Sequence, residues 1–300
     1  MKILTIGNSA SLDDCHLLNL VAAAEGYEKE LYIGTLYHSG CTLARHVENM
    51  TLDRADYSLH ISSSLTPDQP PSTMKDVTLL QGIKYADWDI VVMNGSTATN
   101  YKIGTYTDGN LQKIQDYVNQ NAVKPVVFAW NMYQASPESE ELMTRYEIQT
   151  GKSPEENPYK RIYQSIPDRK TQYAMILDNV SRYIATDDTI TYLIPTGTAV
   201  ENALTSYLEE KDINRDYAHL SDLSRVIASY TWYCTLTGVD HVSQIKLHSI
   251  PMNFLKSTQD KTVDRVLTDG EKQIILESLN NALEKPLELT PSRYTTAPEA

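Results

Sequence analysis

Cysteine and phenylalanine are scarce in this sequence. These shortages limit the kinds of covalent or metal framework and the kinds of aromatic side chain that the protein can use. The 300 residues include 3 Cys and 2 Phe. Cys15, Cys41 and Cys234 lie far apart and form no CxxC pair, so the chain offers neither a disulfide framework nor a zinc-ribbon pattern. Aromatic character comes instead from 20 Tyr, whose hydroxyl-bearing rings suit sugar-facing clefts as well as the edge of a core.

Long apolar runs and positive charge are also lacking. No run approaches 18 apolar residues, and the N-terminus has no apolar segment of signal-peptide length, so no membrane span is expected. The 26 Lys and Arg against 39 Asp and Glu give a net charge of −13, which repels nucleic acid and anionic membranes. We expect a cytoplasmic protein, or a secreted or periplasmic one if a signal peptide has been removed, with a small-molecule or oligosaccharide substrate. The oligomeric state stays open.

Nucleotide-binding motifs are absent as well. The sequence contains no GxGxxG, no Walker GxxxxGK[ST] and no internal repeat, so a nucleotide-binding function loses its main support. We expect no cofactor.

What is present is an alternation of short apolar runs with helical patterns. Strands are predicted at residues 3–6, 30–34, 89–93, 125–130 and 190–195, and helices after Ser11 and at about 110–121, 170–184, 198–210 and 220–236. Such alternation predicts a three-layer α/β/α fold with a doubly wound, mainly parallel sheet of the flavodoxin type. Ligands of such sheets lie beyond the carboxyl ends of the strands.

Three segments fall outside this alternation. Residues 58–78 are rich in Ser and Pro and are predicted to form a long loop. Residues 1–240 are expected to form the α/β domain, with an insertion at about 134–168 over the active face. Residues 241–300 are expected to form a C-terminal helical extension packed on the same domain, in which Thr268 and Glu271 make a capping box.

The first candidate for chemistry is Ser9, in the turn between the first strand and the first helix. A hydroxyl in this turn projects at the carboxyl edge of the sheet, beside a helix N-terminus that can stabilise developing negative charge. Taken alone, Gly7-Asn8-Ser9 favours a helix cap over a nucleophile. Ser11 also fits the N-cap, with Asp14 completing a capping box, and this assignment leaves Ser9 available as a nucleophile.

A base and its partner follow much later in the chain. A nucleophilic serine needs a base within hydrogen-bond reach, and the base needs an acceptor that fixes its tautomer. Asp216 and His219 are three residues apart in one predicted loop and can supply both, although Asp216 also suits a helix-entry position.

An oxyanion hole requires backbone N–H groups and commonly a side-chain amide. Gly40, after the second predicted strand, can present an N–H, and Asn94, after the third, can add an amide donor. The alternatives are an ordinary turn for Gly40 and an Asx-turn for Asn94.

In chain order, these features resemble the SGNH (GDSL-type) hydrolase superfamily. They are GNS in the first turn, a glycine after the second strand, an amide after the third and DxxH near the end of the α/β core. The resemblance covers about residues 1–238, and WDIVVMN (88–94), IPTGTAVENA (194–203) and DYAHLSDLSRVIASYTWY (216–233) are similar to a bacterial branch of that superfamily. The sequence departs from the commonest pattern at Asn8, where Asp is usual, and at Asn94-Gly95-Ser96, which lacks GxND.

The resemblance implies a serine esterase that hydrolyses carboxylic esters through an acyl-enzyme. It implies Ser9 as nucleophile, His219 as general base and then acid, and Asp216 as the orienting carboxylate. The Ser9 and Gly40 N–H groups and the Asn94 side chain would form the oxyanion hole, with Asn100 as an alternative amide. The branch further implies removal of acetyl groups from carbohydrates, which the hydrophilic, Tyr-rich loops suit.

Two alternatives stay open. A thiolate and two imidazoles can hold zinc, so His38, Cys41 and His46 could serve a metal-dependent hydrolase, although no fourth ligand is evident. Otherwise His38 and Trp130 are expected to line the substrate cleft, and no metal is expected. The other alternative is a non-catalytic carbohydrate-binding protein on the same fold.

Overall fold

The computed structural model describes residues 1–139, 141–142, 144, 147–148, 151, 153, 155–156, 166–239, 243, 245, 247 and 267–297. Within them the chain forms a seven-stranded sheet in the order β4-β3-β2-β1-β5-β6-β7. The strands are β1 (Lys2–Gly7), β2 (Tyr32–Tyr37), β3 (Tyr57–Ser63), β4 (Ser72–Val77), β5 (Ile90–Met93), β6 (Val127–Asn131) and β7 (Ile190–Ile194).

The sheet is mixed but mainly parallel. β1 pairs in parallel with both β2 and β5, and the parallel pairing continues through β6 to β7. β3 and β4 pair antiparallel at one edge. Because the order runs outward from β1 in both directions, the predicted doubly wound α/β fold is confirmed.

Alternate residues of the central strands belong to two separate hydrophobic cores, one on each face of the sheet. Ile3 belongs to one core, and its neighbour Leu4 belongs to the other. Val92 and Val91 divide in the same way on β5. Successive side chains of a strand point to opposite faces, so continuous apolar runs are what a sheet covered on both sides requires.

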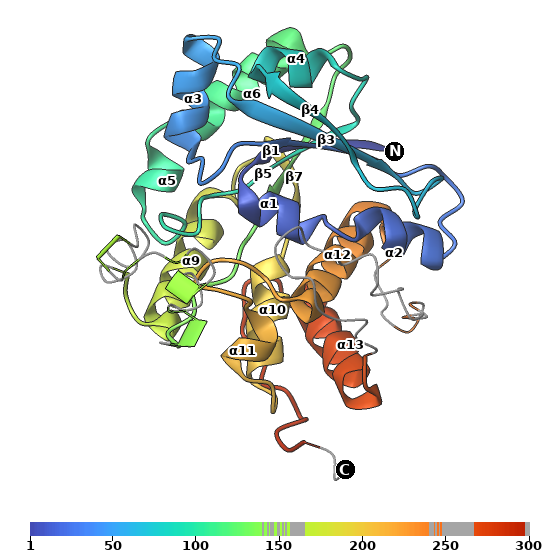
Figure 1. Ribbon diagram of the computed structural model, residues 1–300, viewed down its shortest axis with the longest axis vertical. Helices are drawn as coiled ribbons and strands as arrows, with labels where there is room; N and C mark the ends of the chain where they lie inside the picture. The colour runs from blue at the N-terminus through green and yellow to red at the C-terminus, as the bar shows by residue number, and fades with distance from the viewer. Residues whose placement is uncertain are drawn as a thin grey trace.

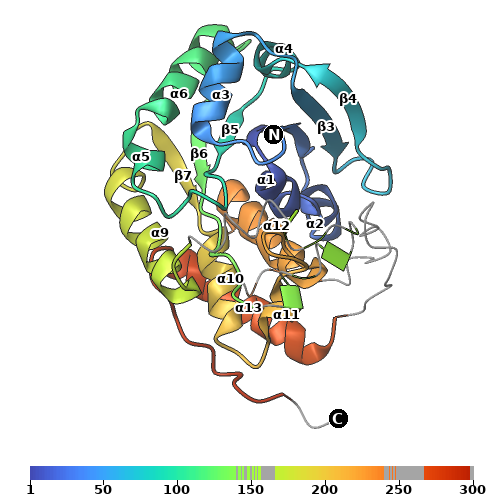
Figure 2. The same cartoon turned by 60° about the vertical axis from the view of Figure 1, so that its left-hand side comes forward.

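Helices cover both faces of the sheet (Figure 1). One side carries α1 (Ser9–Asp14), α2 (Leu18–Ala24), α10 (Thr196–Leu204), α12 (Asp222–Thr237) and α13 (Asp269–Glu284), with the short α11 (Glu210–Ile213) packed on α10 and α12. The other side carries α3 (Leu43–Thr51), α4 (Leu79–Lys84), α6 (Asn110–Asn121) and α9 (Arg169–Tyr183), with α5 (Gly104–Thr107) against α6 and α9 (Figure 2).

Local sequence signals explain several helix boundaries. α6 has the predicted bounds, and its buried positions 111, 114, 115 and 118 follow the helical period. Thr268 caps α13 in the predicted capping box with Glu271. Gly238 ends α12 in the left-handed conformation, at φ 75°, which glycine adopts without a steric penalty.

The prediction of a long loop at 58–78 is wrong. This segment contains most of β3 and all of β4, joined as an antiparallel pair. β4 is exposed from Ser72 to Asp76, so it lacks the apolar alternation that identifies a strand. About half of the predicted insertion at 134–168 lies outside the described residues. No helix among the described residues is long and apolar enough to cross a membrane.

Candidate functional site

The turn after β1 is built by Asn8, which caps the next helix. Asn8 is extended, at φ −131° and ψ −159°, and its Oδ1 accepts from the Ala10 N–H at 3.0 Å. The helix therefore begins at Ser9, and the prediction that Ser11 is its N-cap is wrong. Ser11 lies buried in the first turn and donates its hydroxyl to Asn94 Oδ1 at 2.5 Å.

Gly7 makes this hydrogen bond possible. A Cβ at position 7 would lie 1.8 Å from Ser11 Oγ and 2.6 Å from Asn94 Oδ1. Both distances are far below van der Waals contact, so a side chain would force the two groups apart. The glycine of Gly7-Asn8-Ser9 is explained by this close approach between α1 and the segment after β5.

Asn8 also joins this turn to the turn after β2. Its Nδ2 donates to the Cys41 carbonyl oxygen at 2.9 Å. Gly40 beside it has φ 61°, in the left-handed region, where a residue without Cβ is favoured. The Gly40 N–H has no hydrogen-bond partner in the described part of the chain. An amide at position 8 both accepts and donates, whereas the carboxylate usual in the commonest motif could only accept.

Asp216 and His219 meet as the DxxH spacing predicts. His219 Nδ1 lies 2.8 Å from Asp216 Oδ1 and 2.9 Å from Oδ2. Asp216 Oδ1 also accepts from the N–H groups of Ala218 and His219, each at 2.9 Å. One carboxylate thus shapes the loop and orients the imidazole, which leaves Nε2 as the nitrogen available for proton transfer.

The contact between Asp216 and His219 lowers the pKa of the carboxyl group and raises the pKa of the imidazole. Burial alone raises the pKa of Asp216, but the hydrogen bond and charge of His219, with the Ala218 N–H and Arg215, lower it to about 2. Burial alone lowers the pKa of His219, but the hydrogen bond and charge of Asp216 and the charge of Asp13 raise it above its usual value. Each partner therefore stabilises the charged form of the other.

Ser9 occupies the first position of α1 and is half-buried. Among the described residues, its hydroxyl has no hydrogen-bond partner, so the structure does not join Ser9 to His219. Catalytic hydrogen bonds in unliganded enzymes are commonly long and tighten only with substrate. The role of Ser9 as nucleophile stays a prediction.

The two candidate amides of the oxyanion hole are buried and already bonded. Asn94 Oδ1 accepts from Ser11, and its Nδ2 donates to the Gly95 carbonyl at 2.8 Å. Asn100 Nδ2 donates to the Gln134 carbonyl at 3.3 Å. Asn94 thus joins its segment to α1, and Asn100 joins its segment to the one after β6. The identity of a side-chain donor to the oxyanion stays a prediction.

One of the other predicted roles is wrong, and one alternative finds no support. Trp130 is 1% exposed and packs in the core beside Tyr106, with ring centroids 5.7 Å apart, so it cannot line a substrate cleft. His38, Cys41 and His46 form no metal site, since the described residues contain no group of three or more potential ligands. The Tyr57 ring lies beside both imidazoles, with ring centroids 5.7 Å apart in each pair.

The environments of these three residues agree with that correction. Burial lowers the pKa of His46 to about 3 and raises the pKa of Cys41 to about 12, so the first is neutral and the second an unreactive thiol. His38 is half-buried, with Nδ1 2.8 Å from the Asp56 carbonyl oxygen. Its expected contact with substrate stays a prediction.

Sequence reasoning missed two buried carboxylates at the end of α1. Asp13 and Asp14 are 2% and 0% exposed. Burial raises the pKa of Asp14 well above its usual range, and the charge of Asp13 raises it further, against a hydrogen bond from Asn131 Nδ2. Asn131 Oδ1 in turn accepts from Thr196 at 2.7 Å and from the Trp232 indole at 3.1 Å. The sequence signal was a pair of adjacent carboxylates shortly before the apolar positions Leu17 and Leu18.

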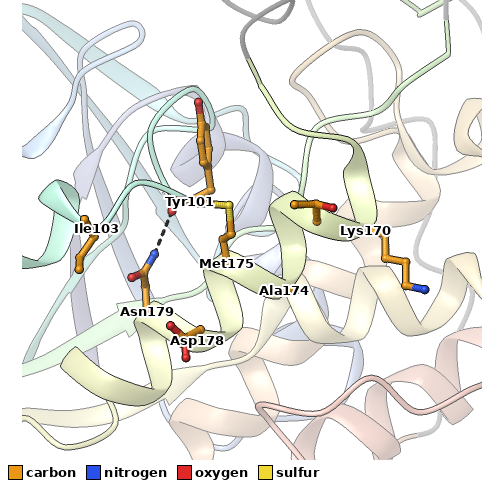
Figure 3. Close-up of a pocket in the computed structure, with 8 residues that line it drawn as sticks. Tyr101, Ile103, Lys170, Ala174, Met175, Asp178 and Asn179 are labelled. Carbon is orange, nitrogen blue, oxygen red and sulfur yellow. Dashed lines mark hydrogen bonds between the residues drawn. The ribbon is translucent and has the colours of Figure 1, made fainter.

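A shallow groove of about 720 Å³ lies between α9 and the segment before α5 (Figure 3). Figure 3 shows the Asn179 amide directed at the Tyr101 carbonyl oxygen, to which it donates at 2.9 Å. None of the residues described along this groove is a predicted site residue; they are Tyr101, Ile103, Lys170, Thr171, Ala174, Met175, Asp178 and Asn179.

Comparison with known proteins connects the chain to one family. The profile of a family described as "Domain of unknown function (DUF4886)" matches residues 2–251. The crystal structure of a DUF4886 family protein from Bacteroides uniformis ATCC 8492 has a TM-score of 0.69 at 20% identity, over 97% of each chain. This likeness shows the shared fold.

A second solved structure is less similar. It comes from Slackia heliotrinireducens, is named provisionally as an SGNH hydrolase, and gives a TM-score of 0.44 at 12% identity over 79% of this chain and 98% of its own. That similarity is too weak to support an argument. No curated protein matches the sequence.

Proposed function

We propose that this chain, which belongs to the DUF4886 family, is a serine esterase of the SGNH type. The observation that carries the proposal is the Asp216–His219 pair, in which both carboxylate oxygens lie within 2.9 Å of Nδ1. An imidazole held in this way has a fixed tautomer and a stabilised charged form, which are the properties of a general base.

The proposed reaction begins with attack by Ser9 Oγ on the carbonyl carbon of an ester. His219 Nε2 takes the hydroxyl proton, and Asp216 stabilises the imidazolium that results. The Ser9 and Gly40 N–H groups stabilise the oxyanion, with the Asn94 side-chain amide as a third donor. His219 then protonates the departing alcohol, and water activated by the same imidazole hydrolyses the acyl-enzyme.

Acetylated carbohydrates are the substrates that we propose. A net charge of −13 disfavours anionic substrates and lipid surfaces at long range. The 20 Tyr provide rings with hydroxyl groups, which suit contact with a polyol.

The direct test is hydrolysis of p-nitrophenyl acetate and a panel of acetylated sugars. The wild type should turn over, and Ser9→Ala and His219→Ala should each reduce kcat by roughly 10³-fold or more. Ser181→Ala, which removes an exposed hydroxyl on α9, is the matched control and should retain full activity.

Two outcomes would reject the proposal. Equal rates in the wild type, Ser9→Ala and His219→Ala would show that Ser9 and His219 are not catalytic. Binding of an acetylated sugar without turnover would instead support the alternative of a non-catalytic carbohydrate-binding protein.

A further inference from the structure

Asp13 lies on the same face of α1 as Ser9. The two residues are four positions apart in one helix, and positions i and i+4 of a helix are neighbours on one side. The Asp13 carboxylate is 2% exposed. A charge at that depth is tolerated only when every lone pair is matched by a donor.

The donors to Asp13 come from the loop that holds His219 and from α12. The Leu220 N–H, directly after His219, donates to Oδ2 at 3.0 Å. Arg225 of α12 donates to Oδ1 from Nε at 3.0 Å and from Nη2 at 2.7 Å. Arg215 Nη1 reaches the same oxygen at 3.3 Å. Residues more than 200 positions apart in sequence are therefore joined through one carboxylate.

Arg215 extends this connection to the proposed catalytic pair. Its Nε lies 3.6 Å from Asp216 Oδ2, so one guanidinium contacts both Asp13 and Asp216. Tyr133, two residues after β6, donates its hydroxyl to the Ala218 carbonyl at 3.0 Å and holds the same loop from another side. The loop is thus fixed to α1 by the Arg215 side chain and by the Leu220 N–H, which both contact Asp13.

We propose that Asp13 is a positioning residue, which clamps the loop carrying Asp216 and His219 onto the helix that begins with Ser9. The inference rests on the proposed esterase function, because its consequence is the distance between nucleophile and base. A displacement of about 1 Å between reacting groups can cost roughly 100-fold in rate. The groups facing His219 are Asp216, Asp13 and Arg215, so the clamp also affects its titration.

The test compares Asp13→Asn with Asp222→Asn. Asp222 also pairs with Arg225, through Nη1 at 3.3 Å, and its charge acts on Arg215. Its side chain is 29% exposed, against 3% for Asp13, so it is the control for loss of a more weakly held carboxylate beside the same arginine. With p-nitrophenyl acetate, Asp13→Asn should lower kcat roughly 10- to 100-fold with KM within about twofold. Asp222→Asn should change neither constant.

Two further measurements separate positioning from general destabilisation. Amide hydrogen exchange should become faster at Leu220 in Asp13→Asn and stay unchanged in Asp222→Asn. The pKa of His219, followed by NMR of the imidazole, should fall in Asp13→Asn. It should rise in Arg215→Gln, since Arg215 opposes the charged imidazole. If Asp13→Asn does not fold, Arg215→Gln is tested in its place, because it removes the guanidinium that contacts both Asp13 and Asp216.

The outcomes also distinguish this inference from the proposed function. The inference that Asp13 positions the loop is overturned if folded Asp13→Asn matches Asp222→Asn in kcat and in the rate of Leu220 hydrogen exchange. It is also overturned if both variants lose activity equally. The esterase function fails separately if Ser9→Ala is as active as the wild type. In that case the exchange and titration measurements still decide whether Asp13 holds the loop.

Discussion

Replacing Gly7 with Ala should destabilise the protein and displace the turn that carries Ser9. The new Cβ would lie 1.8 Å from Ser11 Oγ and 2.6 Å from Asn94 Oδ1. Overpacking of this kind costs about 1–3 kcal/mol, and separating two buried hydrogen-bonded groups costs about 1–3 kcal/mol more. The lower entropy of the unfolded Ala chain offsets up to about 1 kcal/mol. The net expectation is a loss of about 1–5 kcal/mol in the free energy of unfolding.

Urea denaturation, followed by circular dichroism, measures this loss. Gly104→Ala in α5 is the matched control, because its Cβ would meet the movable end of the Asp108 side chain at 3.3 Å, and Ala favours a helix. This control should change the stability by less than about 1 kcal/mol.

A double variant tests the stated cause. Gly7→Ala combined with Ser11→Ala removes the closest contact, so its cost should be smaller than the sum of the two single costs. The reasoning is refuted if Gly7→Ala stays within about 0.5 kcal/mol of the wild type, or if the two single effects add without coupling.

Three other changes have defined expectations. Asp216→Asn should lower kcat roughly 10³- to 10⁴-fold. The variant should lose most stability between about pH 4 and pH 6.5. The lowered pKa of Asp216 stabilises the fold above the unfolded value of 3.8, and the raised pKa of His219 stabilises it below 6.5. Urea midpoints measured across this pH range check the expectation. Asp14→Asn should become more stable relative to the wild type as pH rises above about 4, because the raised pKa of Asp14 makes folding increasingly unfavourable once the unfolded carboxyl ionises. Equal pH dependence in both proteins would contradict the raised pKa of Asp14. Asn8→Asp keeps the cap on α1 but loses the donor to Cys41, so hydrogen exchange at residues 40–41 should become faster while the helix persists.

Much of the fold and part of the site followed from local sequence alone. The buried runs of β1 and β5, the periodicity of α6 and the capping box of α13 depend on neighbouring residues only, so the chain carries their signal directly. The Asp216–His219 contact was also predictable, because three positions in one loop bring the two side chains within reach. β4 was not, since an exposed edge strand has no apolar alternation and is defined by pairing with β3.

The remaining features were decided by contacts between distant segments. Ser11 and Asn8 are both good capping residues, and the choice between them depended on Asn94, 83 positions from Ser11. Trp130 ends an apolar run at the carboxyl edge of the sheet, and only packing against α5 and α9 shows that its ring faces the core. Asp13 looked like an ordinary helix residue until its partner Arg225, 212 positions away, was placed beside it. Sequence determined which chemical groups were available and in what order, whereas tertiary structure decided which of them meet, because burial and pairing depend on neighbours that the local pattern does not encode.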